Sequence, residues 1–194
     1  MITYELERAA SALIVSLLLA SDASAAAGGE LADGGQGLLV SLPQGLPGTL
    51  GFDGQRDQSD DNGIPIIGDK EFRVYRGSGS EQITFPCAIV QAHEASEDFD
   101  TGNVTVRLSV SIQYQADDPD DSTSRPEYEQ QVANIILDGM RTDSLPTDLN
   151  TNRVDADRLT VIGLIDASQT MRREGRATVF EADFTLYCAG LDLT

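Results

Sequence analysis

The chain has 194 residues and a mass of 20.8 kDa, which suits one domain, or one domain with a long insertion, better than two separate cores. Apolar residues make up 40% of it and Trp is absent, so we expect a modest core built from Val, Ile, Leu and Ala. Thirteen basic and 32 acidic side chains give a formal charge of −19, which repels the DNA backbone and disfavours tight DNA binding.

The N-terminal segment allows two interpretations. An apolar run at residues 9–20 precedes Ala23-Ser24-Ala25, as in a secretory signal peptide. The preceding MITYELER, however, carries two acidic residues against one basic residue, whereas a signal peptide begins with positive charge, and the run is too short to span a bilayer. Apolar residues also recur at three- and four-residue spacing from Ile2 to Leu17. We therefore expect a packed amphipathic helix, with secretion as the alternative.

Residues 28–79 differ abruptly in composition from the rest of the chain. They hold 13 of the 18 glycines and three of the seven prolines. This composition indicates an insertion or extended arm outside the core, within a single domain that spans residues 1–194. Two short strands are expected in it, at residues 38–42 and 72–75. The arm is either partly disordered or ordered only in an assembly.

The second half of the chain carries clear strand patterns. Apolar and polar residues alternate without a break from Val104 to Tyr114, which predicts a long strand with one buried face. The same alternation from Phe180 to Cys188 predicts a strand near the C-terminus. Shorter strands are expected at residues 85–92 and 159–165, and Pro86, which lacks an N–H, belongs at a strand start or an edge.

One further helix is expected between these strands. Ser124 and Glu127 have capping-box spacing, Pro126 suits a first helical turn, and apolar residues from Tyr128 to Met140 follow one helical face. The predicted fold is therefore α+β: an antiparallel or mixed sheet of about four main strands, two helices on one face, and the long Gly-rich insertion.

Tests for catalytic and metal-binding motifs give little. Asp57, Ser59 and Asp61 have the spacing of a calcium loop, but the required glycine comes one position late and Gly68 stands where the bidentate glutamate belongs. Cys87 and His93 are a conceivable nucleophile and base, as in a small hydrolase, without any supporting motif. Cys87 and Cys188 form one disulfide or none. We expect no enzyme, no cofactor and no metal site.

Two charged segments are candidate interaction surfaces. The acidic rim, Asp117, Asp118, Asp120 and Asp121, follows the long strand and is expected to form a turn at its end. The only basic concentration, Arg172, Arg173 and Arg176, lies between the last two strands, where a hairpin places it at a tip. The two segments have opposite charge and are candidate contacts between copies of the chain or with a neighbouring protein.

The order of these parts resembles the tail terminator, or tail-completion, proteins of long-tailed bacteriophages. The resemblance covers residues 1–20 and 84–190. It rests on an N-terminal helix followed by three segments: FPCAIVQAHEASEDFDTGNVTVRLSVSIQYQADD, EYEQQVANIILDGM and LTVIGLIDASQTMRREGRATVFEADFTLYCAG. These motifs are patterns of spacing, and the chain departs from the family in the length of its Gly-rich stretch, residues 28–79.

The resemblance implies a structural virion protein, made in the host cytoplasm, that forms a ring of six copies at the head–tail junction. Such a ring terminates the tail tube, joins it to the head-proximal neck or connector protein, and lets DNA pass through its channel without specific binding. An acidic channel would repel the phosphate backbone and let DNA slide. The alternatives are a tail-tube or head-completion subunit and a secreted acidic binding module. No membrane partner is expected.

Overall fold

The structure is a computed structural model that describes most of the chain outside the Gly-rich stretch. The described residues are 2–26, 66–67, 70–77, 83–98, 102–115, 126–141, 143–152 and 160–189. Their helices and strands are α1 (Ile2–Ala26), β1 (Ile66–Ile67), β2 (Lys70–Glu71), β3 (Arg73–Arg76), β4 (Cys87–Asp98), β5 (Asn103–Gln115), α3 (Pro126–Met140), α4 (Leu145–Thr151), β6 (Thr160–Glu174) and β7 (Ala177–Ala189). The fold is α+β, as expected.

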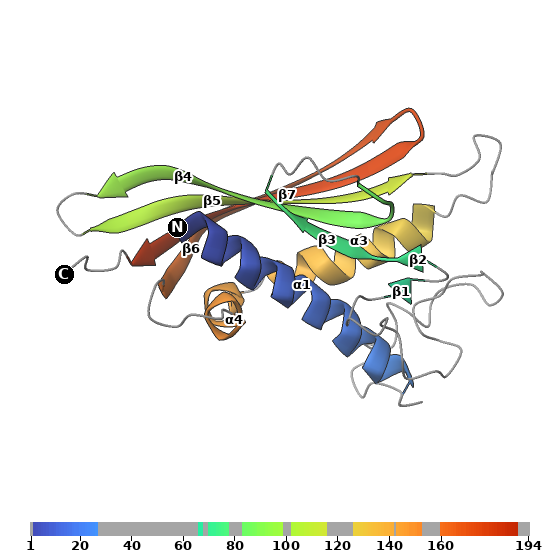
Figure 1. The fold of residues 1–194 in the computed structure, drawn as a ribbon, viewed down its shortest axis with the longest axis horizontal. Coiled ribbons are helices and arrows are strands. Elements are labelled where there is room, and N and C mark those ends of the chain that lie inside the picture. Colours follow the sequence, from blue (N-terminus) through green and yellow to red (C-terminus); the bar gives the residue numbers. More distant parts are fainter. Residues whose placement is uncertain are drawn as a thin grey trace.

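The main sheet has five strands in the order β3-β4-β5-β7-β6. Only β3 and β4 run parallel, and the other neighbours are antiparallel, so the sheet is mixed. It has one strand more than the four main strands expected. A separate pair, β1 and β2, lies beside the main sheet (Figure 1). The four long strands form two hairpins, β4–β5 and β6–β7, joined through β5 and β7 in the middle of the sheet.

The central strand β5 follows the alternation of its sequence. Its even-numbered residues from Val104 to Tyr114 are buried, and its odd-numbered residues are exposed or half-buried. Five of these six buried side chains lie opposite another buried one on β7, for example Leu108 opposite Phe184, and Tyr114 lies opposite the half-buried Thr178. This pairing gives the sheet one apolar face and one polar face, because successive side chains of a strand point to opposite sides. The predicted long strand is thus confirmed.

The end of the Gly-rich stretch belongs to the core, contrary to the expectation that residues 28–79 lie outside it. β3 forms one edge of the main sheet, and the Phe72 side chain just before it is fully buried. Gly77, with φ of +69°, donates its N–H to the Val90 carbonyl at 2.8 Å where the chain leaves β3. The expected strand at residues 38–42 lies outside the described residues.

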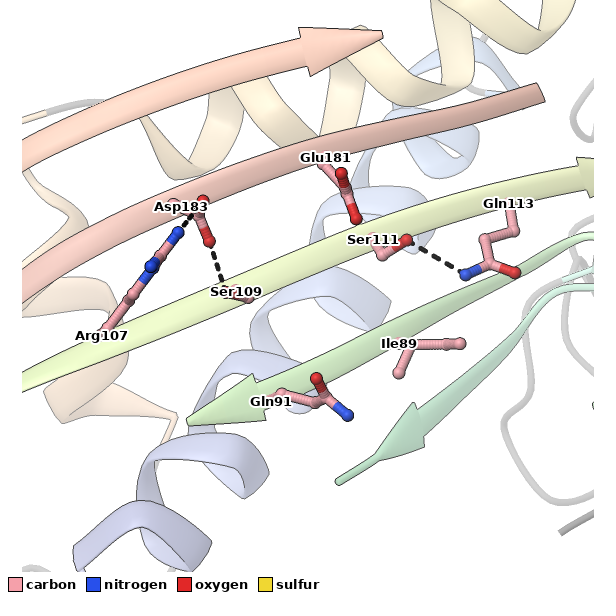
Figure 2. A pocket seen from close by; sticks show the side chains of 8 residues that line it. All are labelled: Ile89, Gln91, Arg107, Ser109, Ser111, Gln113, Glu181 and Asp183. Carbon is pink, nitrogen blue, oxygen red and sulfur yellow. Dashed lines mark hydrogen bonds and ion pairs between the residues drawn. The ribbon is translucent and has the colours of Figure 1, made fainter. Parts of the chain in front are cut away.

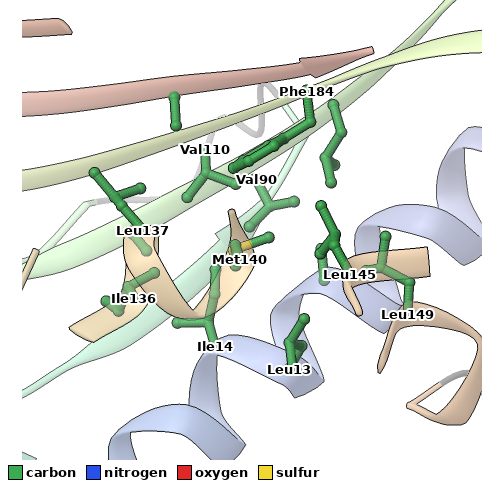
Figure 3. Packing of buried hydrophobic residues seen from close by; sticks show 14 of the residues in the cluster. Leu13, Ile14, Val90, Val110, Ile136, Leu137, Met140, Leu145, Leu149 and Phe184 are labelled. Carbon is green, nitrogen blue, oxygen red and sulfur yellow. The ribbon is translucent and has the colours of Figure 1, made fainter. Parts of the chain in front are cut away.

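Three helices cover the apolar face of the sheet (Figure 1). α1 buries the apolar stripe that its spacing predicted, including Leu6, Ala10 and Leu13, and the Glu7 carboxylate accepts the N–H of Ala92 on β4 at 2.9 Å. Figure 3 shows side chains of all three helices meeting those of the sheet, with Val90, Val110 and Phe184 above Ile14, Ile136, Met140, Leu145 and Leu149. A chain cut after Ala25 would lose the part of this core that α1 supplies.

α3 agrees with the predicted helix, whereas α4 was not predicted. α4 has only seven residues, too few for a periodic pattern, and Pro146 in its first turn resembles a break in the chain. Leu145 and Leu149 are nevertheless buried on one side of it. The expectation of two helices on one face is therefore corrected to three among the described residues.

Candidate functional site

The predicted basic residues lie at the tip of the β6–β7 hairpin but do not form one patch. Arg172 points to the polar face of the sheet and forms an ion pair with Glu181 at 3.2 Å. Arg173 lies opposite Thr178 on the helical face, near Glu129 at the start of α3. Burial raises the pKa of the Glu129 carboxyl, and a hydrogen bond from Thr178 and the charge of Arg173 partly offset this rise. The third arginine, Arg176, is exposed in the turn.

The acidic rim expected to oppose these arginines, Asp117, Asp118, Asp120 and Asp121, lies outside the described residues. The contact between the two charged segments therefore stays a prediction. The turn itself agrees with the sequence: Glu174 is opposite Ala177, and Gly175 between them has φ of +61°, a conformation that glycine adopts without strain. The hairpin tip lies at the end of the sheet opposite the β4–β5 turn (Figure 1).

The free edge of β6 is the main feature that the sequence did not reveal. β6 is the last strand of the sheet, and in the described part of the chain no strand pairs with its outer side. Three of its side chains are large, apolar and more than half exposed: Ile162 at 53%, Ile165 at 59% and Met171 at 54%. A long edge strand with exposed apolar residues is a template for pairing with another chain.

The first half of this edge is protected. Asn150 on α4 donates to the carbonyl of Val161 at 2.8 Å and accepts its N–H at 2.9 Å, so both outward backbone groups of Val161 are satisfied. Two irregularities in the register, at Ile162 and Ile165, kink the strand as β-bulges do, and the Asp166 carboxylate accepts the Ala167 N–H at 2.9 Å. Bulges and capped backbone groups discourage edge-to-edge pairing, so the open part of the edge begins after Ala167.

The polar face of the sheet holds a shallow pocket of about 410 Å³ (Figure 2). The Asp183 carboxylate accepts hydrogen bonds from Arg107, at 2.6 Å, and from the Ser109 hydroxyl. The hydrogen bond from Arg107 is the main cause that lowers the pKa of Asp183. Gln113 donates to the Ser111 hydroxyl at 3.1 Å beside them. These polar groups bond to one another, which gives a polar face whose charges are paired.

The sequence predicted that Arg107 and Asp183 lie on polar strand faces, but it did not predict their contact. Their contact depends on the pairing of β5 with β7, which sets Arg107 opposite Thr185 and Ser109 opposite Asp183. The helices α3 and α4, which separate β5 from β7 in the sequence, lie on the other face of the sheet (Figure 1). The alternation of each strand was the only signal available, and it carries no information about which strands are neighbours.

The two cysteines are free and buried, so of the two states that the sequence left open the structure shows no disulfide between them. Cys87 is opposite Gln113 and Cys188 is opposite Val104, positions about 30 Å apart along β5, whereas a disulfide needs Cα atoms within about 7 Å. His93 lies six residues beyond Cys87 on β4, about 20 Å away, so it cannot act as its base. Burial raises the pKa of Cys87 to about 12 and that of Cys188 to about 11.

The described residues contain no group of three His, Cys, Asp or Glu side chains that could hold a metal ion. The expected weak calcium-loop spacing at Asp57, Ser59 and Asp61 lies outside the described ranges. None of the described helices combines the length and hydropathy needed to cross a bilayer. A scan of protein-family models finds no match to this chain, and a search of curated protein sequences finds none either.

Proposed function

We propose that the chain is a structural subunit of the tail terminator type, which closes into a ring of six copies at the junction between a phage tail tube and the neck. The observation that carries the proposal is the β6–β7 hairpin. Its tip carries Arg172 and Arg173 on opposite faces and Arg176 in the turn, on a chain whose formal charge is −19, and the strand that leads to it has an exposed apolar edge. A basic projection on an acidic protein favours an acidic partner, which a second copy of the chain supplies.

The arrangement of the elements also supports this function. The order of an N-terminal helix, a hairpin with a long strand, a helix and a closing hairpin is the order on which the resemblance to tail terminators rests. A ring needs two different complementary surfaces on each subunit, because head-to-tail contacts repeat around the axis. The hairpin tip, with arginines on both faces and in the turn, is one proposed surface, and the acidic rim, residues 117–121, is its proposed counterpart.

The proposed partners follow from this position in the virion. The chain contacts itself around the ring, the last ring of the tail-tube protein on one side and a neck or connector protein on the other. DNA passes through the channel and is repelled by its acidic wall, so it slides without specific binding. A tail-tube subunit would instead stack with itself indefinitely, which separates that alternative from a terminator.

The experiment that tests the proposal reverses the charge of the hairpin. The Arg172→Glu/Arg173→Glu variant should fold but should lose ring formation in negative-stain electron microscopy and sedimentation, because the projection would then repel the acidic rim. The matched control reverses Arg8 and Arg76, whose guanidinium groups lie 5.9 and 5.4 Å from the Tyr4 ring centre near the opposite edge of the sheet. Circular dichroism separates a folding defect from an assembly defect.

Normal rings from the Arg172→Glu/Arg173→Glu variant would overturn the docking role of the hairpin. Equal loss in the control variant would show that net charge matters and not the position of the arginines. Open-ended stacks of the wild-type chain would favour the tail-tube alternative over the terminator.

A further inference from the structure

The open edge of β6 is complementary to itself, and we infer that it pairs with β6 of a second copy around a two-fold axis. The pairing covers residues 168–174 of each copy, with Met171 opposite its own equivalent. The pairing depends only on features of β6, and its consequence for assembly rests on the proposed function.

The backbone of this segment is oriented for pairing. Residues of an antiparallel strand alternate between those whose backbone groups bond the neighbouring strand and those whose groups point away from it. The Ala167 N–H points away from β7, since it bonds to Asp166, and it lies opposite Phe184. The alternation continues through regular register to Glu174, so the outward groups belong to Gln169, Met171 and Arg173. Pairing Met171 with its equivalent, and Gln169 with Arg173 of the second copy twice, forms about six new backbone hydrogen bonds.

The charges of the segment favour one register. With Met171 at the centre, Gln169 faces Arg173 of the second copy, Ser168 faces Glu174, and Thr170 faces Arg172. No two like charges are opposite, and the pairing stops at Glu174, where β6 ends and the turn that holds Arg176 begins.

The neighbouring registers that keep the same backbone bonding are worse. Centring the pair on Thr170 sets Asp166 opposite Glu174 of the second copy, and this like-charge contact occurs twice. Centring it on Arg172 sets two arginines directly opposite each other. Like charges directly opposite destabilise a strand pair, so charge favours the Met171 register over both. The two Met171 side chains, each 54% exposed in one copy, meet in it and are removed from water.

The proposed pairing lies in the part of the β6 edge that has no other protection. The bulges and caps end at Ala167, and the proposed pairing is centred four residues beyond it, in the half of β6 that has regular register. A two-fold contact joins only two copies and cannot repeat around a polar ring. Given the proposed function, the pair is therefore the form of the chain before assembly, and it keeps the hairpin covered until the ring forms.

A charge change at Gln169 tests the pairing, because Gln169 faces Arg173 of the second copy twice. Analytical ultracentrifugation of the wild-type chain should show a dimer, and Gln169→Arg should raise its dissociation constant by at least about tenfold, because it sets like charges opposite. Gln169→Glu sets opposite charges there instead and should lower the dissociation constant. The matched control is Asp143→Arg, at an exposed residue before α4.

Cross-linking gives a second readout. In the proposed register the Cα atoms of the two Met171 residues are about 5.5 Å apart, within the range of a disulfide. Oxidised Met171→Cys protein should form a covalent dimer, whereas Ser168→Cys, six residues from its own equivalent in this register, should not. The native cysteines are buried and do not interfere.

Each outcome separates this inference from the proposed function. A monomer at all concentrations, a Gln169→Arg variant that still dimerises normally, or cross-linking at Ser168 but not at Met171 would overturn the two-fold pair. Rings that still form in that case leave the terminator function standing. A dimer that behaves as expected in a chain that never forms rings would overturn the terminator function and leave the pair.

Discussion

Asn150 forms hydrogen bonds with both outward backbone groups of Val161, as a neighbouring strand would, at the start of β6. We expect Asn150→Ala to lower the free energy of unfolding by about 1–3 kcal/mol, because two partly buried backbone groups lose their partner. Asn152→Ala is the control, since its side chain only adds a second bond to the Asp148 carbonyl, which the Asn152 N–H already reaches. Urea denaturation measures both, and equal losses would contradict this role of Asn150.

The two cysteines should be unreactive in the folded chain. Burial raises the pKa of Cys87 to about 12 and of Cys188 to about 11, so both thiols stay protonated at neutral and mildly alkaline pH, and the thiolate is the reactive form. We expect negligible reaction with Ellman's reagent at pH 8 in buffer, and two equivalents of thiol in urea without reductant. A fast equivalent from the folded chain, or fewer than two after unfolding, would contradict the structure.

The sequence predicted the burial of some residues but not the contacts of others. The alternation of β5 was enough to predict which of its side chains are buried, because burial on one face produces that pattern directly. The pairing of Arg107 with Asp183 and the capping of Val161 by Asn150 could not be predicted. Both need two segments to be neighbours in space, and no local pattern encodes that.

At the scale of elements, periodic segments were predictable and the others were not. α1, α3, β5 and β7 each bury one face against a complete layer, which leaves a period in the sequence. Only the first part of β6 was expected, as residues 159–165, whereas the strand continues to Glu174. Its distal half is exposed on both faces, so apolar and polar residues have no reason to alternate there. The candidate pairing edge lies in that unpatterned half.

Phe72 tests whether the end of the Gly-rich stretch belongs to the core. The side chain is fully buried beside β3, so Phe72→Ala should lower the free energy of unfolding by about 3–5 kcal/mol through lost burial and the cavity left behind. Ile83→Ala is the control, because Ile83 is 38% exposed and should cost much less. Equal and small losses in urea denaturation would show that β3 contributes little to the sheet.

At the scale of the whole molecule, a strongly acidic chain carries three of its exposed basic residues on a hairpin that reaches one end of the sheet (Figure 1). The proposed ring and the proposed two-fold pair both use this hairpin, through its arginines in the first case and through the edge of β6 in the second. They therefore compete. A variant that loses the pair without losing the arginines, such as Gln169→Arg, should form rings at lower protein concentration than the wild-type chain.

Native mass spectrometry of the wild-type chain over a concentration series tests the ring most directly, because it counts copies in each species. We expect a dimer at low concentration and a closed species of six copies at high concentration, with nothing larger. A ladder of ever larger oligomers, or a chain that never exceeds a dimer at any concentration, would contradict the terminator function.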